Sequence, residues 1–318
     1  MNKYVIGIDV GGTKVAYGLF DDKRNLLTEH RHDSDTNLTS EEFFDFITDT
    51  IFDICKTQKI SINDLLGIGV AWPSMIDSET GQILITSNLV KVSNFPAIEY
   101  LSKKFDNKVK IGLCNDAHVA AIAEHRFGAG RGFDHILFCP VSTGISSAMI
   151  INGELFRGTY GFSGESGHGI ATPGFGIMCG CGNRGCFMSW TSGSMVPKHV
   201  QNWIAEGEET IMTTYVDDPK KLTMEHIDRA FTENDPLAIR AVEQMVIFLS
   251  VWIYNLYILL NINCFVFGGG LLSMNARILE RVRVEFDKFN VCSDKPVYFK
   301  TAELGSKAGI IGASELIF

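Results

Sequence analysis

Residues 4–20 read YVIGIDVGGTKVAYGLF and predict two short β-strands joined by a glycine turn. The first apolar run ends at Val10, and the pair Gly11-Gly12 permits the chain to reverse tightly. A second run continues from Lys14 to Phe20, and a third covers 26–32. The chain is therefore predicted to begin with a sheet of neighbouring strands.

The same pattern of strand, polar turn and strand returns near the middle of the chain. Residues 136–141 are apolar, Ser142-Thr143-Gly144 predict a turn, and 145–151 end at the hairpin signal Asn152-Gly153. A duplicated pair of domains, each offering a Gly/Thr turn, would be suited to hold a polyphosphate from two sides. Two unrelated hairpins explain the pattern equally well.

Helical periodicity separates the β-runs and predicts an α/β fold. Thr39 opens a capping box, after which apolar residues recur at helical spacing. The apolar run 246–260 has 15 residues, fewer than the roughly 20 that a bilayer requires, and predicts a buried helix. Further helices are predicted at 116–127, 235–260 and 276–289, and further strands at 66–71, 108–114 and 264–267.

Length and composition exclude several classes of protein. The chain has 318 residues, enough for about two domains, and 46% are hydrophobic, which excludes a disordered protein or a small peptide. A formal net charge of −9 disfavours nucleic acid as a partner. Eight cysteines are too few for a disulfide scaffold, and no signal peptide precedes Tyr4, so we expect reduced thiols and a cytoplasmic protein.

The first glycine turn carries groups that suit a nucleotide phosphate. Gly11 and Gly12 let backbone N–H groups approach a phosphate, Thr13 adds a hydroxyl, and Asp9 can hold Mg²⁺ through water. Lys14 ends this predicted nucleotide-binding segment. The spacing matches neither a Rossmann motif nor a Walker P-loop, and an ordinary Gly-Gly hairpin is the alternative.

Two later turns extend the predicted nucleotide site. Thr143 and Gly144 would face the phosphates from the second half, and the run Gly268, Gly269 and Gly270 would let a flat adenosine lie close to the backbone. Each turn alone is weak evidence. Together they are informative, because a protein without a ligand has little reason to keep residues whose ordering costs about 0.5 to 1 kcal/mol each.

Asn115-Asp116 follows a predicted strand and precedes a predicted helix. A carboxylate fixed at such a junction can act as a general base and accept the proton of an attacking hydroxyl during phosphoryl transfer. The alternative is a plain helix N-cap.

A histidine and three cysteines form the strongest local signal in the chain. His168, Cys179, Cys181 and Cys186 have ligand spacing for a tetrahedral zinc ion, with intervening glycines for tight turns. Four protein ligands leave no position for water, so the zinc would be structural rather than hydrolytic. Glu165 stands three residues before the histidine, whose second ring nitrogen could therefore face a ligand. Buried free cysteines and an exposed loop acid are the alternatives.

Taken in order, these residues resemble the ROK family of sugar kinases and sugar-responsive repressors, within the actin-like ATPase superfamily. The resemblance spans nearly the whole chain. Its carriers are Asp9 to Thr13, Asn88-Leu89, Asn115-Asp116, Ser142 to Ile145, Glu165 to His168, Cys179 to Cys186, Gly268 to Gly270, Leu304-Gly305 and Ala308-Gly309.

The resemblance implies two RNase H-like domains around a cleft, over 1–115 and 116–305, with a final helix at about 306–318 returning to the first. It also implies a sugar, ATP with Mg²⁺, a zinc knuckle and a homodimer. By resemblance, Asp116 deprotonates the sugar 6-hydroxyl. Residues implied to hold the other hydroxyls are Asn88, Asn115, Glu165 and His168.

Three departures from the family pattern bear on the substrate. Met188 stands where the family usually has a glutamate that contacts the sugar, so a hydrogen-bond acceptor is replaced by a thioether. Ala71 to Ser74 replaces a glycine-containing loop, and Ser146-Ser147 replaces a glycine pair. These changes make plain glucose a doubtful substrate without naming another sugar.

The predicted function is an ATP-dependent kinase of a hexose or N-acetylhexosamine. The alternative is a sugar-binding sensor or inactive regulator of the same family. A DNA-binding repressor is disfavoured, because the phosphate segment begins by Tyr4 and leaves no room for a preceding helix-turn-helix, and because the net charge is −9. No membrane partner is predicted.

Overall fold

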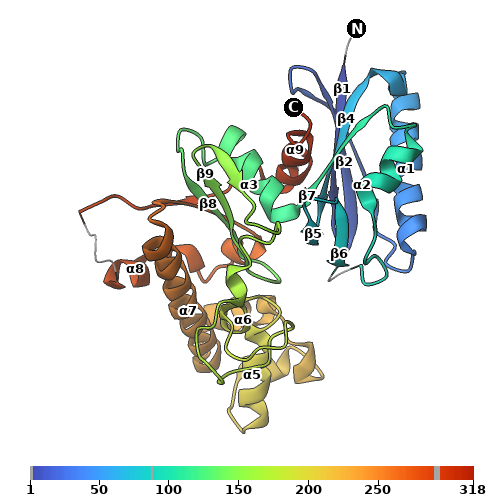
Figure 1. Cartoon of the computed structure of the whole chain (residues 1–318). Helices are drawn as coiled ribbons and strands as arrows, with labels where there is room; N and C mark the ends of the chain where they lie inside the picture. The colour runs from blue at the N-terminus through green and yellow to red at the C-terminus, as the bar shows by residue number, and fades with distance from the viewer. Residues whose placement is uncertain (1–2, 87–88, 290–293) are drawn as a thin grey trace. The chain divides into compact units, whose positions relative to one another are not determined.

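The computed structural model describes residues 3–86, 89–289 and 294–318, and the chain forms two compact units (Figure 1). Unit 1 contains residues up to 134 together with 148–163 and 303–318, and unit 2 contains 135–147 and 164–302. The chain therefore passes between the units at four places. Asn88, a predicted sugar contact, lies outside the described residues.

Unit 1 is built on a five-stranded sheet in the order β3-β2-β1-β4-β7. The first three strands form an antiparallel meander, as the apolar runs predicted, whereas β4 and β7 run parallel to β1. Because β1, β4 and β7 are parallel neighbours, their carboxyl ends meet at one edge. The strands are β1 (Tyr4–Val10), β2 (Lys14–Asp21), β3 (Leu26–Asp33), β4 (Leu65–Trp72) and β7 (Lys110–Asn115).

Helices α1 (Ser40–Thr57) and α2 (Ala97–Lys104) cover one face of this sheet. The predicted capping box is confirmed: the Thr39 hydroxyl accepts from the Glu42 N–H, and the Glu42 carboxylate accepts from the Thr39 N–H. Aromatic rings fill the core beneath the helices, and Phe44 stacks on Trp72 with ring centroids 5.3 Å apart.

Helix α9 (Ala308–Ser314) packs on the opposite face, against β1 and β4. Glycines in the strands allow the close approach. A Cβ at Gly7 would lie 2.0 Å from the carbonyl oxygen of Ile310, and one at Gly69 would lie 1.8 Å from that of Ala313. No larger residue fits at either position without moving the helix.

Helix α3 (Asp116–Phe127) also belongs to unit 1, and it packs against α9. A Cβ at Gly312 would lie 1.8 Å from the Val119 carbonyl oxygen. The compact units thus differ from the predicted division at 115/116, because this glycine contact ties α3 to the first unit. The remaining strands of unit 1 are β5 (Ser74–Asp77), β6 (Gln82–Thr86), β9 (Ala148–Ile151) and β10 (Glu154–Phe156).

The hairpin that joins β9 to β10 confirms the Asn-Gly signal. Asn152 and Gly153 have φ angles of 54° and 79°, which are the positive values that a tight two-residue hairpin requires.

Unit 2 has a parallel core of three strands, with β11 between β8 and β12. Five helices of this unit are described. The elements are β8 (Ile136–Pro140), α4 (Phe187–Thr191), α5 (Val196–Ala205), α6 (Met224–Thr232), α7 (Pro236–Leu260), β11 (Cys264–Gly268), α8 (Ile278–Phe289) and β12 (Tyr298–Thr301).

Helix α7 is long and apolar enough to cross a membrane by length and composition, with a mean hydropathy of 1.5 over its most apolar window. It begins where Asp235 caps the Ala238 N–H and Pro236 occupies the first turn. Within unit 2 it packs against α4, α5, α6 and α8, and 56% of that window is buried. This packing is typical of the core helix that the sequence predicted.

Candidate functional site

The carboxyl edge of the parallel strands in unit 1 gathers three predicted site residues. Asp9 pairs in register with Ala71 of β4, and Trp72 of β4 pairs with Asn115 of β7. Asp9 and the Asn115-Asp116 junction therefore lie at the same edge, separated by one strand. Strand register alone therefore brings these residues to one edge of the sheet.

Asp9 is a largely buried carboxylate. Burial raises its pKa above the ordinary range, and the nearby charge of Arg31 partly opposes this rise. The start of α9 lies against it, because a Cβ at Gly309 would be 2.2 Å from Asp9 Oδ2. A buried carboxylate of this kind gains from a cation, which fits the predicted role of holding Mg²⁺ through water.

The glycine turn after β1 is held by the end of β3. The Gly11 N–H donates to the Lys14 carbonyl at 2.9 Å, and the Ser34 hydroxyl donates to the Gly11 carbonyl at 2.6 Å. Thr13 and Lys14 are exposed, and Gly12 before them is half-buried. The turn thus presents a hydroxyl and an ammonium group, as the predicted phosphate segment requires.

The structure distinguishes the positions of Asn115 and Asp116 at the start of α3. Asn115 is the N-cap of α3, because its Oδ1 accepts from the N–H groups of Ala117 at 2.9 Å and His118 at 3.3 Å. Asp116 is the first helical residue, and its exposed carboxylate accepts from the Ala117 N–H at 2.7 Å. The helix N-terminus is a favourable position for a carboxylate.

In unit 2, two predicted turns lie side by side because β8 and β11 are parallel neighbours. The Val141 N–H donates to the Gly268 carbonyl at 2.8 Å. Gly269 has a φ of 99°, and a Cβ there would lie 2.3 Å from the Val141 carbonyl oxygen, so only glycine fits. This contact joins the turn at Thr143 to the glycine run of 268–270.

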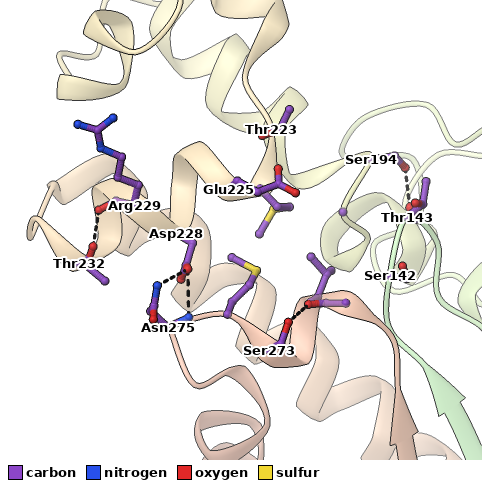
Figure 2. A pocket seen from close by; sticks show the side chains of 15 residues that line it. Ser142, Thr143, Ser194, Thr223, Glu225, Asp228, Arg229, Thr232, Ser273 and Asn275 are labelled. Carbon is purple, nitrogen blue, oxygen red and sulfur yellow. Dashed lines mark hydrogen bonds between the residues drawn. The ribbon is translucent and has the colours of Figure 1, made fainter. Parts of the chain in front are cut away.

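A pocket of about 590 Å³ opens beside these turns (Figure 2). Thr143 and Gly270 line it, while Gly144, Gly268 and Gly269 belong to the adjoining turns and are outside the lining set. Figure 2 shows Ser194 next to Thr143, where its hydroxyl donates to the Thr143 carbonyl at 2.8 Å. The pocket is large enough for a nucleoside.

The far side of the pocket comes from residues that the sequence analysis missed. Asp228 of α6 is 8% exposed and accepts from the Asn275 N–H, the Asn275 amide and the Ala276 N–H at 2.9–3.0 Å. It therefore fixes the loop before α8. No local pattern marks these residues, because Asp228 and Asn275 are 47 positions apart and meet only in the folded unit. The other polar lining residues that were missed are Ser194, Thr223, Glu225, Arg229, Thr232 and Ser273.

The predicted metal ligands converge in unit 2. The ligand atoms of His168, Cys179, Cys181 and Cys186 all lie within 4.8 Å of one another. Cys181 and Cys186 Sγ are 3.7 Å apart, and Cys179 Sγ is 3.5 Å from His168 Nδ1. Tetrahedral zinc would separate two sulfurs by about 3.8 Å and a sulfur from a nitrogen by about 3.5 Å. The donor set and its spacing fit zinc, and they disfavour independent buried thiols.

The metal cluster also orients a predicted sugar contact. His168 presents Nδ1 to the cysteines, while its Nε2 lies 3.8 Å from Glu165 Oε2. Gly167 packs closely on the turn after β8, since a Cβ there would be 2.2 Å from the Ile145 carbonyl oxygen. The second ring nitrogen of His168 therefore faces Glu165 rather than the cysteines.

Two of the three departures from the family pattern, Met188 and Ser147, lie in unit 2 with this pair. The Cε of Met188, on α4 directly after Cys186, comes within 3.5 Å of the position that a Cβ on Gly144 would occupy. The buried Ser147 hydroxyl lies 2.8 Å from that of Ser166 and holds the segment before His168.

Comparison with known proteins gives consistent matches over the full length. The model described as "ROK family" matches residues 5–318. A glucokinase of Streptomyces coelicolor is 27% identical over 318 residues, covering 98% of this chain and 96% of the relative. The structure of a ROK hexokinase from Thermus thermophilus has a TM-score of 0.83 at 27% identity and covers 99% and 97% of the two chains. That of a ROK family glucokinase from Streptomyces griseus, in complex with glucose and AMPPNP, has a TM-score of 0.77 at 25% identity and covers 98% of each.

Proposed function

The chain belongs to the ROK family, and on that premise we propose that it is an ATP-dependent kinase of a sugar. It transfers the γ-phosphate to the 6-hydroxyl of a hexose or an N-acetylhexosamine. The observation that carries the proposal is the placement of Asp116, an exposed carboxylate fixed at a strand-to-helix junction on the same edge as Asp9. The relative named glucokinase and the complex with glucose and AMPPNP support the classes of acceptor and donor.

Asp116 acts as the general base. Its backbone is held by β7 on one side and α3 on the other, and Asn115 satisfies the first N–H groups of the helix. The carboxylate accepts the hydroxyl proton as the sugar oxygen attacks the phosphorus in line. The other sugar hydroxyls are assigned to Asn88, Asn115, Glu165 and His168.

The nucleotide is assigned to two sets of residues. In unit 2, Thr143 and Gly144 face the phosphates, and the glycine run 268–270 lies along the adenosine at the edge of the pocket. In unit 1, Gly11, Gly12, Thr13 and Lys14 contact phosphate, while Asp9 holds the hydrated metal. When bound, Mg²⁺ neutralises the charge on the phosphates.

The cysteine cluster holds a structural zinc ion. Four protein ligands close its coordination, so the metal supplies rigidity and takes no part in phosphoryl transfer. Its role is to fix the ring of His168 and the start of α4. An open, hydrolytic metal site is not supported by this donor set.

Met188 selects the substrate. A thioether cannot accept a hydrogen bond of useful strength, so a sugar hydroxyl facing it would lose about 1 to 3 kcal/mol of binding free energy. A sugar that lacks this hydroxyl, or that carries an apolar substituent there, is favoured over glucose.

Turnover of a sugar panel tests the proposed function. ADP release with Mg·ATP would be measured for glucose, mannose, allose, fructose, N-acetylglucosamine and N-acetylmannosamine. Asp116→Asn is the blank, and Asp106→Asn, an exposed loop carboxylate outside the site, is the matched control. We expect one sugar to be turned over by the wild type and the control, and Asp116→Asn to be slower by about 10²- to 10⁴-fold.

If none of the sugars caused ADP release, the proposed kinase activity would be contradicted. If a panel sugar then raised the melting temperature, the alternative of a sugar-binding regulator would be supported instead, because a ligand that binds only the folded state stabilises it. Sugar-dependent ADP release of equal rate in the wild type and Asp116→Asn would also contradict the assignment of the base.

A homodimer and a cytoplasmic location complete the proposal. The family resemblance supports the dimer. The seven cysteines in the described part of the chain form no disulfide with one another, which agrees with a reducing compartment. Light scattering after size exclusion would measure the mass of the assembly directly.

A further inference from the structure

Side chains of helix α3 form hydrogen bonds with the backbone beside three of the four places where the chain passes between the units. These crossings lie at 134/135, 147/148, 163/164 and 302/303. His118 Nε2 donates to the Ser163 carbonyl at 2.9 Å, and His125 Nε2 donates to the Phe133 carbonyl at 2.8 Å. Glu124 binds the backbone of the last crossing. One helix of unit 1 thus fixes the backbone beside three crossings, and its first residue is Asp116.

Glu124 makes the most extensive of these contacts. Its side chain is fully buried, and its two oxygens accept three backbone N–H groups. Oε2 accepts from Ala129 at 2.9 Å and from Glu303 at 3.1 Å, and Oε1 accepts from Leu304 at 2.8 Å. A buried carboxylate is costly unless hydrogen bonds compensate it, so these N–H groups are what keep Glu124 in place.

Two neighbouring features support a role at the crossing. A Cβ at Gly128 would lie 2.0 Å from Glu124 Oε2, so the glycine that ends α3 leaves room for the carboxylate to reach the crossing. Arg131 forms an ion pair with the Glu303 side chain at 2.8 Å. Immediately beyond the crossing, Gly305 has a φ of 52°, where most residues are strained.

We propose that Glu124 is a positioning residue for the phosphoryl transfer, acting by holding the 303–304 crossing against the helix that begins with Asp116. Rigid units change their mutual orientation only by backbone rotation at the segments that join them. Glu124 fixes the 303–304 segment to α3. The backbone conformation at this crossing and the position of Asp116 therefore depend on each other. This inference rests on the proposed function, because Asp116 must be the base for the link to affect turnover.

Glu315 provides the matched comparison. It is another buried carboxylate of unit 1, with a side chain that is 1% exposed, and it forms ion pairs with Arg24 and Arg126. Arg126 belongs to α3, so Glu315 also stabilises this helix. Its carboxylate contacts these two arginines and none of the crossing segments. Replacing each glutamate by glutamine therefore separates the effect of losing a buried carboxylate from the effect of losing its contact with the 303–304 crossing.

The experiment compares Glu124→Gln with Glu315→Gln in the full-length protein. Glutamine keeps the size of the side chain, but its amide group faces N–H donors and cannot accept from all three. We expect both variants to melt at lower temperature. Only Glu124→Gln should lose kcat, by about 10- to 100-fold, because a small displacement of a catalytic group is enough for a loss of that size. Equal kcat in the two variants would overturn the proposal.

Hydrogen exchange provides a readout that does not depend on turnover. Peptides covering 303–305 would be followed with and without Mg·AMPPNP plus a panel sugar. Protection that increases with ligand in the wild type and Glu315→Gln, and fails to increase in Glu124→Gln, supports the proposal even if no sugar is phosphorylated. The same ligand response in all three proteins would contradict it.

Gly128→Ala keeps the test informative if Glu124→Gln fails to fold. The methyl group added at Gly128 would lie 2.0 Å from Glu124 Oε2, so it displaces the carboxylate from the crossing. It should reproduce the loss of kcat and of ligand-dependent protection. Wild-type values in this variant would count against the proposal.

Discussion

The two groups of candidate site residues are held by different physical means. In unit 1, Asp9, Asn115 and Asp116 stand at the ends of parallel strands, where backbone hydrogen bonds fix them. In unit 2, Glu165 and His168 lie in a loop whose only regular element is the short 3-10 turn 166–168, beside the cysteine cluster. The first group is therefore preorganised by the fold, whereas the second is proposed to depend on the zinc ion. Changes to the cluster and changes to the sheet should consequently have different effects.

After loss of the base itself, the largest effect is expected from breaking the cluster. Cys179→Ser should lower zinc content and reduce kcat/KM for the sugar by about 10- to 100-fold, because His168 belongs to both the cluster and the sugar site. Zinc would be measured by atomic emission. Cys55→Ser, a buried thiol of unit 1 outside any site, is the control. A stable, zinc-free, fully active Cys179→Ser would refute the dependence on metal.

The sheet side is tested by Gly69→Ala. The added Cβ would meet the Ala313 carbonyl at 1.8 Å and must push α9 away from β4. We expect the free energy of unfolding to fall by about 1 to 3 kcal/mol, a typical penalty for overpacking. Urea unfolding measures this. Zinc content should stay at the wild-type level, and its loss would show that the two regions are not independent.

Met188→Glu changes the substrate rather than the stability. A restored acceptor should raise kcat/KM for glucose relative to the natural sugar by roughly 5- to 100-fold, the equivalent of about 1 to 3 kcal/mol. Met188→Leu, which is apolar and of similar size, is the control and should leave the preference unchanged. If neither variant alters the preference, Met188 does not select the substrate.

The smallest expected effect is a pH dependence of stability that arises from a buried histidine of unit 2. His199 is buried, donates to the Ser189 carbonyl at 2.9 Å and stacks on Trp190 of α4. Burial lowers its pKa, so its contribution to stability is present above the ordinary histidine pKa and is lost as pH falls through the lowered value.

His199→Gln should therefore flatten the fall in melting temperature between about pH 6.5 and about pH 5. His30→Gln, at an exposed position, should leave the curve as it is. Identical pH curves for the wild type and His199→Gln would contradict this interpretation.

The sequence predicted what local chemistry determines. Strand ends, the caps at Thr39 and Asp235, the Asn152-Gly153 hairpin and the convergence of the metal ligands all follow from short-range patterns. The α/β class follows from alternating periodicity.

The residues that sequence reasoning missed act over long separations. Asp228 and Asn275 look like ordinary polar residues until the fold joins them, and Glu124 reaches Leu304 across 180 positions. Likewise, the glycine contact between α3 and α9 places 116–134 in unit 1, and no composition change marks that boundary.

The central claim is that Asp116 removes the sugar proton and contributes little to binding. Titration calorimetry of sugar and Mg·AMPPNP into Asp116→Asn, combined with single-turnover phosphorylation, tests this claim most directly. We predict affinities within about threefold of the wild type and a chemical step slower by about 10²- to 10⁴-fold. Wild-type turnover in the variant, or loss of sugar binding without a separate loss of chemistry, would contradict the account.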